Sequence, residues 1–469
     1  MRQRGPRLRR RVARTGAALA AVVLGLAVAP AGAGDGAAPS PLGSCGPIER
    51  THEVVELRGM RLRRLAGTPL DRIGMVAWRA GRAQPIPFQV DERIGTRIAM
   101  PGGPAPEADD HPGVLDADDA LLFMACDAGA RAPAGTPPRA DGREIRIDDP
   151  RTGATAWAYL VLSDAPPRTD RRYVRYDPAR DTVTTARWSI GCVDALPSYF
   201  ALGLTGPLGP NVVDGLRLRA DAVLRANLAR WSLTERDGRN ELVAWTAGPI
   251  RVVRRSKHEV EIGLGIHLSA GLLHTAFYGE HVLAPGSLKL PFSPSVFFRE
   301  ITALGGVDLR GMEGWRYLAP GVPAGGLAVD GRMDERERAY AGRGRWFALV
   351  RGDEAIAVAI TMSEELERAL PLDLVYVDDA TRAAPPEIAP GSVPFVGVRA
   401  REVERLPGGR YRFQLRVFAV PGWRAGAEQA LLAQVDVPLT AEVSIPPDLE
   451  PRRRPTQDPG DGAPAAQPR

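Results

Sequence analysis

The side chains best suited to moving protons in this sequence gather in one segment. It holds four of the six histidines, namely His258, His267, His274 and His281. Histidine changes its charge near neutral pH, so it can give and take protons there. If the chain turns back through Ser269 to Leu272, His267 and His274 lie nearly opposite each other in a hairpin. We predict catalytic groups at His267, His274 and Glu280, with ligand-binding groups on the same sheet at Arg254, Glu259, Glu261 and Tyr278.

The same residues also have a purely structural interpretation. An antiparallel sheet with one face in water carries polar side chains on that face, and a histidine there often only forms hydrogen bonds. A metal site at the histidines is not predicted, because the sequence has no H-E-x-x-H or H-x-H spacing. The histidine segment is therefore a candidate site whose three-dimensional arrangement decides between the two interpretations.

Three arginines just before this segment suit an anionic ligand. Arg251, Arg254 and Arg255 flank two valines. A guanidinium can hold a carboxylate, such as that of a uronic acid, through two hydrogen bonds. Salt bridges to the nearby Glu259 and Glu261 explain the arginines equally well, so both interpretations stay open.

An acidic segment from Glu107 to Asp119 suits a hard cation, because carboxylate oxygens bind calcium. Its candidate calcium ligands are Asp116, Asp118 and Asp119. The segment is not an EF-hand, since counting from Asp116 puts Leu121 where that loop requires glycine. A solvated acidic loop is the alternative, and no other cofactor is predicted.

Several enzyme classes lack their signatures in this chain. The sequence has no G-x-S-x-G nucleophile elbow, no G-x-x-x-x-G-K phosphate loop and no G-x-G-x-x-G that opens a helix after a strand. We therefore set aside α/β hydrolases and nucleotide-dependent enzymes.

The elements that must position these residues are predicted to be strands. The chain contains 51 glycines and 43 prolines, which interrupt short apolar runs throughout, as is typical of all-β proteins. Residues 259–268 and 410–417 alternate between apolar and polar types, and this alternation predicts two half-buried strands.

Turn and capping signals predict three more elements. Asp237-Gly238 between two apolar runs predicts a hairpin over residues 233–245. Thr361 and Glu364 have capping-box spacing, which predicts a helix over residues 362–370. Residues 432–443 are predicted to add a closing strand, which Pro438 would confine to the edge of a sheet or break.

The predicted fold is all-β, with a large antiparallel β sandwich of supersandwich type and a smaller N-terminal β domain. A chain of this length exceeds the usual size of a single core, so more than one unit is expected. Breaks rich in proline and polar residues set the predicted boundaries: 1–33 signal peptide, 34–45 linker, 46–180 N-terminal β domain, 181–447 large β-sandwich domain and 448–469 disordered tail.

The first 33 residues have the pattern of a cleavable export signal: seven arginines, an uncharged run and small residues at the end. We therefore expect a periplasmic or secreted protein. The uncharged run is too short for a good membrane span, so no integral span is expected in the mature chain. Removing seven of the 61 basic residues leaves 54 against 56 acidic ones, and without a basic surplus no nucleic-acid partner is expected.

Three cysteines, Cys45, Cys126 and Cys192, follow the signal. An oxidising compartment permits one disulfide and one free thiol, but the spacing does not choose among the three pairings. Residues 42–45 resemble a lipoprotein box. Because that box does not directly follow the apolar run, attachment of lipid to Cys45 is not favoured.

Three short stretches resemble a group of exported bacterial proteins of unknown function. They are Ile86-Pro87-Phe88-Gln89-Val90-Asp91-Glu92 with residues 115–125, then residues 248–255, then Val377-Asp378-Asp379. That group is similar to the β supersandwich of galactose-mutarotase-like and polysaccharide-lyase proteins. The resemblance implies a broad sheet whose concave face binds carbohydrate through His, Glu, Arg and Tyr side chains. No catalytic residue of those families maps onto a matching motif here.

The sequence thus predicts an exported β-sandwich protein that binds carbohydrate, with catalytic activity left open. The alternative is a non-enzymatic envelope component with a structural or partner-binding role. The arrangement of the histidine segment relative to any cleft distinguishes the two.

Overall fold

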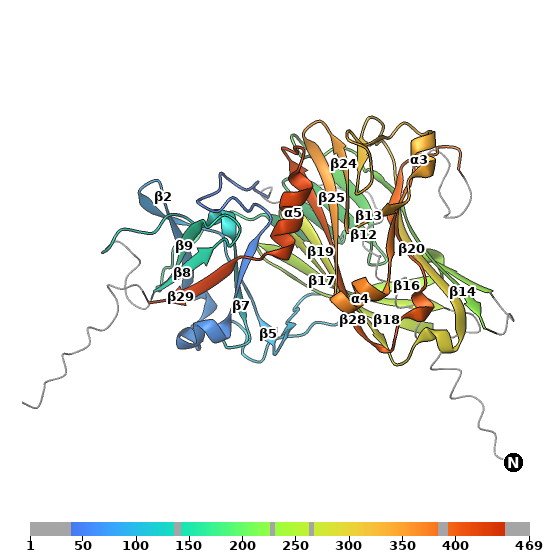
Figure 1. Ribbon diagram of the computed structural model, residues 1–469. Helices are drawn as coiled ribbons and strands as arrows, with labels where there is room; N and C mark the ends of the chain where they lie inside the picture. The colour runs from blue at the N-terminus through green and yellow to red at the C-terminus, as the bar shows by residue number, and fades with distance from the viewer. Residues whose placement is uncertain (1–38, 136–141, 226–229, 262–266, 383–392, 446–469) are drawn as a thin grey trace, which may run out of the picture.

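The computed structural model describes residues 39–135, 142–225, 230–261, 267–382 and 393–445. Strands dominate the described chain, and they form a smaller and a larger unit that lie side by side (Figure 1). The paired strands run antiparallel in both units. The all-β sandwich class predicted from the sequence is confirmed.

The smaller unit packs two main sheets around its own apolar core. One sheet has the order β1 (Val54–Arg58), β7 (Ala120–Met124) and β4 (Gln89–Asp91). The other has the order β29 (Thr440–Ser444), β8 (Arg143–Asp148), β9 (Thr155–Leu162), β2 (Ile73–Arg79) and β3 (Arg82–Pro85). β5 (Arg93–Ile94) and β6 (Arg97–Ile98) pair with each other as a separate two-stranded ribbon.

The larger unit is built from three sheets. The longest has the order β16 (Gly238–Ala247), β17 (Arg251–Glu261), β18 (His267–Tyr278), β19 (His281–Leu290), β28 (Gly409–Pro421), β25 (Glu354–Met362), β24 (Trp346–Arg351), β21 (Arg316–Leu318) and β22 (Leu327–Ala328). The second has the order β15 (Arg230–Thr234), β14 (Val213–Leu224), β20 (Phe298–Leu309), β27 (Phe395–Ala400), β26 (Leu372–Val377) and β23 (Gly342–Arg343). The third has the order β10 (Val174–Asp177), β11 (Thr182–Thr185), β12 (Trp188–Val193) and β13 (Leu196–Leu202).

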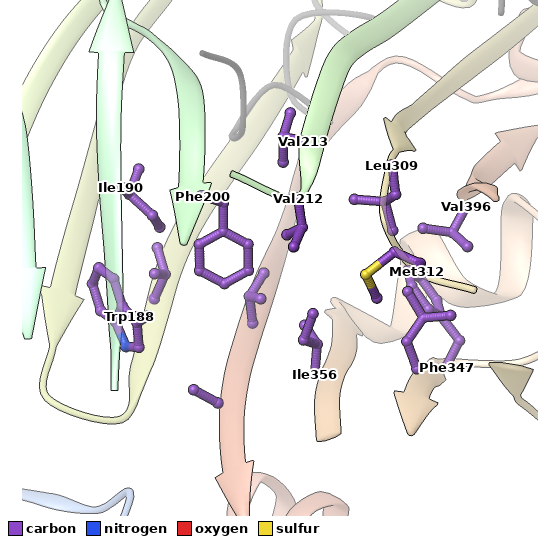
Figure 2. Close-up of a cluster of buried hydrophobic side chains, with 14 of the residues drawn as sticks. Trp188, Ile190, Phe200, Val212, Val213, Leu309, Met312, Phe347, Ile356 and Val396 are labelled. Carbon is purple, nitrogen blue, oxygen red and sulfur yellow. The ribbon is translucent and has the colours of Figure 1, made fainter. Parts of the chain in front are cut away.

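The main core lies where the inward faces of these three sheets meet. Trp188 and Phe200 from the four-stranded sheet, Val396 from the six-stranded sheet and Phe347 and Ile356 from the nine-stranded sheet are all buried in it. Figure 2 shows these side chains directed into one apolar interior. Burial of such side chains is the main force that holds the sheets together.

Helices are short and lie outside the sheets. They are α3 (Glu335–Ala339), α4 (Glu364–Ala369) and α5 (Ala427–Asp436), with 3₁₀ turns η1 (Gly59–Leu65), η2 (Leu70–Arg72), η3 (Ala125–Asp127), η4 (Glu235–Asp237), η5 (Pro294–Val296) and η6 (Val403–Arg405). Within the described ranges, none of the helices has both the length and the apolar character of a membrane span.

The predicted strand over 410–417 is confirmed, since it lies inside β28 with Tyr411 and Val417 buried and Arg410 and Arg412 exposed. The predicted helix over 362–370 corresponds to α4, but its N-cap is Ser363 rather than Thr361. These elements depend on local pattern alone, which explains why sequence analysis located them.

Three predicted elements differ from the structure, because the positions at which the chain turns differ from those that the local patterns indicated. The two ends of the predicted strand over 259–268 lie on different strands, since Val260 of β17 pairs with Leu268 of β18, and residues 262–266 fall outside the described ranges. The hairpin over 233–245 does not form, because β15 pairs with β14 in one sheet and β16 with β17 in another. The predicted strand over 432–443 is divided, since residues 432–436 belong to helix α5 and residues 440–443 to the edge strand β29.

The chain crosses between the units at its C-terminal end. β29, which the sequence analysis assigned to the larger domain, pairs with β8 of the smaller unit (Figure 1). The predicted boundary at residue 180 falls between β10 and β11, which pair with each other.

A disulfide joins Cys45 to Cys126 across a sequence separation of 81 residues, and Cys192 is free and buried. The bond ties the segment before β1 to the turn after β7. Cys192 lies in the main core, where burial raises the pKa of its thiol to about 12. The structure thus selects one of the three pairings that the sequence left open.

Replacing Cys45 and Cys126 together by alanine should lower the free energy of unfolding by about 4 kcal/mol, because the bond restricts a long loop in the unfolded chain. Urea unfolding of the double variant and the oxidised wild type measures the difference. Cys192→Ala keeps the bond and serves as the control. An unchanged midpoint in the double variant would contradict the pairing.

Candidate functional site

The predicted site lies on the hairpin of β17 and β18, near one edge of the nine-stranded sheet. The expected turn through 269–272 is wrong, because β18 runs without a break from His267 to Tyr278. His267 and His274 therefore lie on the same strand. In register, His274 pairs with Arg255 and His267 pairs with Glu261.

The two faces of this hairpin have different surroundings, since neighbouring residues of a strand point to opposite faces. Val252 and Phe277 point into the main core. Val253 and Ala276 instead pack against Met100 of the smaller unit. Both faces are covered at this end, so the hairpin does not present the exposed polar face that the sequence suggested.

Arg254 points toward the core and is only 3% exposed. Its Nη2 forms an ion pair with Oδ2 of Asp181, which follows β10. Burial lowers the pKa of Arg254, but its neighbours, among them the Asp181 carboxylate, outweigh burial and raise that pKa. This guanidinium is thus engaged inside the protein and does not face solvent.

Arg255 and His274 lie on the opposite face, next to the smaller unit. Arg255 Nε donates a hydrogen bond of 2.8 Å to His274 Nε2, and Arg255 Nη1 lies 2.8 Å from Glu107 Oε2. Because a guanidinium can only donate, Nε2 of His274 is unprotonated. Burial and the Arg255 charge both lower the pKa of His274.

The remaining predicted residues of the hairpin lie toward its far end. Glu259 Oε1 lies 3.0 Å from Lys257 Nζ, in a partly exposed ion pair. Glu261 and His267 are paired through their backbones, but their side chains fall outside what the structure describes.

Tyr278 belongs to a buried aromatic stack between the two units. Its ring lies parallel to that of His281, with 4.4 Å between centroids, and His281 in turn contacts His52 and Phe418. Burial lowers the pKa of His52 to about 4 and that of His281 well below its ordinary value. Both rings are therefore neutral packing groups at neutral pH. Sequence analysis missed His52, because it lies far from the histidine segment in the chain.

An arginine network lies beside this stack. Arg251 Nε donates to Asp91 Oδ2 at 2.8 Å, and its Nη1 donates to the Tyr278 hydroxyl at 2.9 Å. Glu56 accepts from Arg93 at 2.9 Å and from Arg251 at 3.5 Å. Of the three arginines expected to bind an anionic ligand or nearby glutamates, Arg251 and Arg255 are thus paired with carboxylates of the smaller unit, and Arg254 is paired with Asp181 of the larger unit.

Glu280, in the turn after β18, is 5% exposed. Its Oε1 lies 3.9 Å from Arg187 Nε, a distance too long for a hydrogen bond. Burial raises the pKa of this carboxyl to about 7, although the Arg187 charge opposes the shift. Glu280 and His274 thus have different partners, and the His267 side chain, the third predicted catalytic group, falls outside what the structure describes.

The acidic segment brings three carboxylates together. Asp109, Asp116 and Asp119 each offer an oxygen, and these oxygens lie within 4.8 Å of one another. Asp118 does not belong to this group, and its Oδ2 accepts a hydrogen bond from the Gly95 amide. Burial raises the pKa of Asp119 to about 6, and the charges of Asp116 and Asp109 contribute to the shift.

A groove of about 730 Å³ lies beside α4 where β25 ends. We call it the basic groove, because three arginines (Arg368, Arg410 and Arg412) and one carboxylate (Glu365) line it. β25 pairs with β28 only as far as Phe413, so the preceding residues of β28 line the groove. Arg410 and Arg412 are exposed there, and Lys289 of β19 lies opposite Arg410 in register. The alternation of residues 410–417 in the sequence already placed Arg410 and Arg412 on the polar face of a strand. That Lys289 lies beside them follows only from the pairing of β19 with β28.

A second groove, of about 970 Å³, separates the smaller unit's two main sheets. Consecutive residues of β1 and β29 line it, together with Arg58, Arg61 and Arg63. Both strands are the last of their sheets, so each has an edge free of strand pairing. Arg61 Nη1 reaches across to the Ala441 carbonyl at 2.6 Å.

No protein-family model matches this chain, and no curated protein matches it either. Among solved structures it is similar to an alpha-mannosidase from Enterococcus faecalis V583, with 9% identity and a TM-score of 0.41 over 84% of this chain and 44% of that one. It is also similar to a glycosyl hydrolase family 38 protein from Enterococcus faecalis, with 9% identity and a TM-score of 0.39 over 85% of this chain and 46% of that one. The chain spans less than half the length of either. The resemblance to galactose-mutarotase-like proteins stays a prediction.

The raised pKa of Glu280 has a measurable consequence for stability. The folded protein binds this proton more readily than the unfolded chain does. The contribution of the protonated Glu280 carboxyl to the free energy of unfolding is therefore fully present below the ordinary pKa of 4.5. It is lost as the pH rises through about 7. Glu280→Gln should remove about 3 kcal/mol of pH dependence between pH 5 and pH 8.

Urea unfolding of both proteins at the two pH values measures this difference. Glu300→Gln, at an exposed position of β20, is the matched control and should follow the wild type. If the stabilities of the wild type and Glu280→Gln change in parallel with pH, the carboxyl does not titrate as inferred.

Proposed function

We propose that this chain is an exported carbohydrate-binding protein that takes acidic polysaccharides in the basic groove between α4 and β28. The observation that carries the proposal is the direct pairing of Lys289 with Arg410 across two strands. Like charges opposite each other in a sheet are destabilising. Arg412, two residues on, adds a third positive charge to the same exposed face.

These charges are available to a ligand. Among the described residues, none forms an ion pair with Lys289, Arg410 or Arg412, whereas Arg254 and Arg255 are buried in ion pairs. An exposed guanidinium holds a carboxylate through two parallel hydrogen bonds, which suits the uronic acids of acidic polysaccharides. The sequence analysis considered the same ligand class, an anionic sugar, for Arg251, Arg254 and Arg255. The present proposal places that ligand at a different site.

The groove suits a sugar chain better than a nucleic acid. Single-stranded nucleic acids bind where aromatic rings are open for base stacking. Tyr411, the aromatic residue of the lining, is buried, and its hydroxyl donates to the Pro407 carbonyl at 2.8 Å. The expected export and the loss of the basic surplus with the signal support the same choice. The proposal is one of binding and includes no reaction.

Binding of polygalacturonate, measured by calorimetry with neutral dextran for comparison, tests the proposal. Arg410→Gln with Arg412→Gln should weaken polygalacturonate binding at least roughly tenfold, because hydrogen bonds to charged groups contribute about 1.5–3 kcal/mol each. Added salt should weaken binding to the wild type, because exposed charges are screened.

Arg336→Gln with Arg338→Gln is the matched control, because it removes the same charge from α3, at the other end of the larger unit (Figure 1). It should leave the affinity unchanged, and circular dichroism should verify that both double variants fold. Equal loss in the two double variants, or equal affinity for dextran, would overturn the proposed site.

The groove between β1 and β29 favours a second candidate, the binding of an extended protein segment. Two free strand edges offer backbone hydrogen bonds to an added strand. Peptides selected from a random library on the mature protein test this candidate. Bound peptides should slow hydrogen exchange in both β1 and β29, and peptides that bind without this protection would count against it.

A further inference from the structure

The acidic segment lies on the smaller unit, far along the chain from the basic groove. Asp109 belongs to the long connection between β6 and β7, and Asp119 directly precedes the first residue of β7. Asp116 lies between them on the same connection. The three carboxylate oxygens that lie within 4.8 Å of one another thus come from the middle and the C-terminal end of one connection.

Asp109 gives a second and independent indication of a ligand. Its side chain is buried, with 7% of the residue exposed, and neither carboxylate oxygen accepts a hydrogen bond of ordinary geometry from the described residues. The backbone amides of Asp110 and His111 approach the carboxylate outside that geometry. A buried carboxylate without partners is costly. One of its oxygens belongs to the group shared with Asp116 and Asp119, so the side chain is directed into that group.

The other two carboxylates are held in place by backbone amides. Asp119 Oδ1 accepts from the Arg93 amide at 3.1 Å, and its Oδ2 accepts from the Asp116 amide at 2.9 Å. Asp116 Oδ1 accepts from the Asp118 amide at 2.9 Å. Asp116 Oδ1 also accepts from the Asp119 amide at 3.3 Å. These bonds fix the orientation of the carboxylates, while both oxygens of Asp119 keep a further lone pair and Asp116 Oδ2 accepts none of these bonds.

No fixed cation offsets the three carboxylates. Within the described part of the chain, no arginine or lysine forms an ion pair with Asp109, Asp116 or Asp119. The nearby Arg93 directs its guanidinium to Glu56 instead. The nearest basic group is His111, which is exposed and lies 3.7 Å from Asp116 Oδ2.

We propose that Asp109, Asp116 and Asp119 bind a calcium ion. All three ligands are carboxylate oxygens, which calcium prefers and which zinc usually supplements with Cys or His. Water completes the coordination shell on the solvent side, next to the partly exposed Asp116. The ion holds the loop against the start of β7. The site is independent of the proposed carbohydrate groove.

The expected binding is that of an extracellular module, with a Kd of about 0.1–1 mM. Calorimetric titration of calcium into the EDTA-treated full chain should show one saturable site. The melting temperature should rise with calcium concentration, because the ion binds the folded state. Magnesium at the same concentrations should bind more weakly, since it gives up its water reluctantly.

The variant Asp109→Asn tests the proposed calcium site with two measurements, the calcium affinity and the melting temperature in EDTA, which should change in opposite directions. It should abolish calcium binding, and in EDTA it should melt at a higher temperature than the wild type, because one of three repelling charges is gone. Asp110→Asn, at the exposed neighbouring position, should keep both the calcium affinity and the wild-type melting temperature in EDTA.

Three results would overturn the proposal. They are the absence of calcium binding at millimolar concentration, equal loss of binding in Asp109→Asn and Asp110→Asn, and preference for zinc with loss of binding in His111→Ala. Because Asp109→Asn is expected to fold, and its melting temperature in EDTA is measured, a failure to bind is not confused with a failure to fold.

Discussion

The buried ion pair between Arg251 and Asp91 joins the two units, and much of the structure around it depends on that contact. Gln89 fixes it from the side, since its Oε1 accepts hydrogen bonds from the amides of Ile250 at 3.2 Å and Arg251 at 3.0 Å. Gly248 lies so close to Gln89 that a Cβ there would come within 2.2 Å of Oε1. Buried charges are tolerated only when they are paired and hydrogen-bonded, so both units must be present in this arrangement.

This junction explains what became of the predicted site. The smaller unit covers one face of β17 and β18, and the four-stranded sheet covers the other. Arg254, His274 and Tyr278 are therefore held in internal contacts to Asp181, Arg255 and Arg251. The charged side chains that remain available to a ligand lie outside this covered region. They are at the start of β28 and in the loop before β7. Both surfaces carry uncompensated charge, one positive and one negative.

The two proposals fit one setting without depending on each other. Acidic polysaccharides and calcium are both met outside the cytoplasm, where the N-terminal pattern predicts that the protein works. The acidic loop is also linked to the junction, because Asp119 accepts from the Arg93 amide and Arg93 pairs with Glu56, a second acceptor of Arg251. A calcium ion in the loop would therefore support the contact between the units.

The sequence by itself determined features that depend on neighbouring residues: the all-β class, the alternation within β28, the position of α4 and the acidic loop with Asp116 and Asp119. It also indicated Gln89, Asp91 and residues 248–255 as one set, and these stretches meet at the junction. Only the tertiary structure decided that Cys45 bonds to Cys126 and that Lys289 pairs with Arg410. It also decided that Asp109, rather than Asp118, lies next to Asp116 and Asp119, and that His274 and Glu280 have separate partners. Alternation records which face of a strand is buried, but partners such as Arg251 and Asp91 lie 160 positions apart. Local patterns cannot specify contacts at that separation.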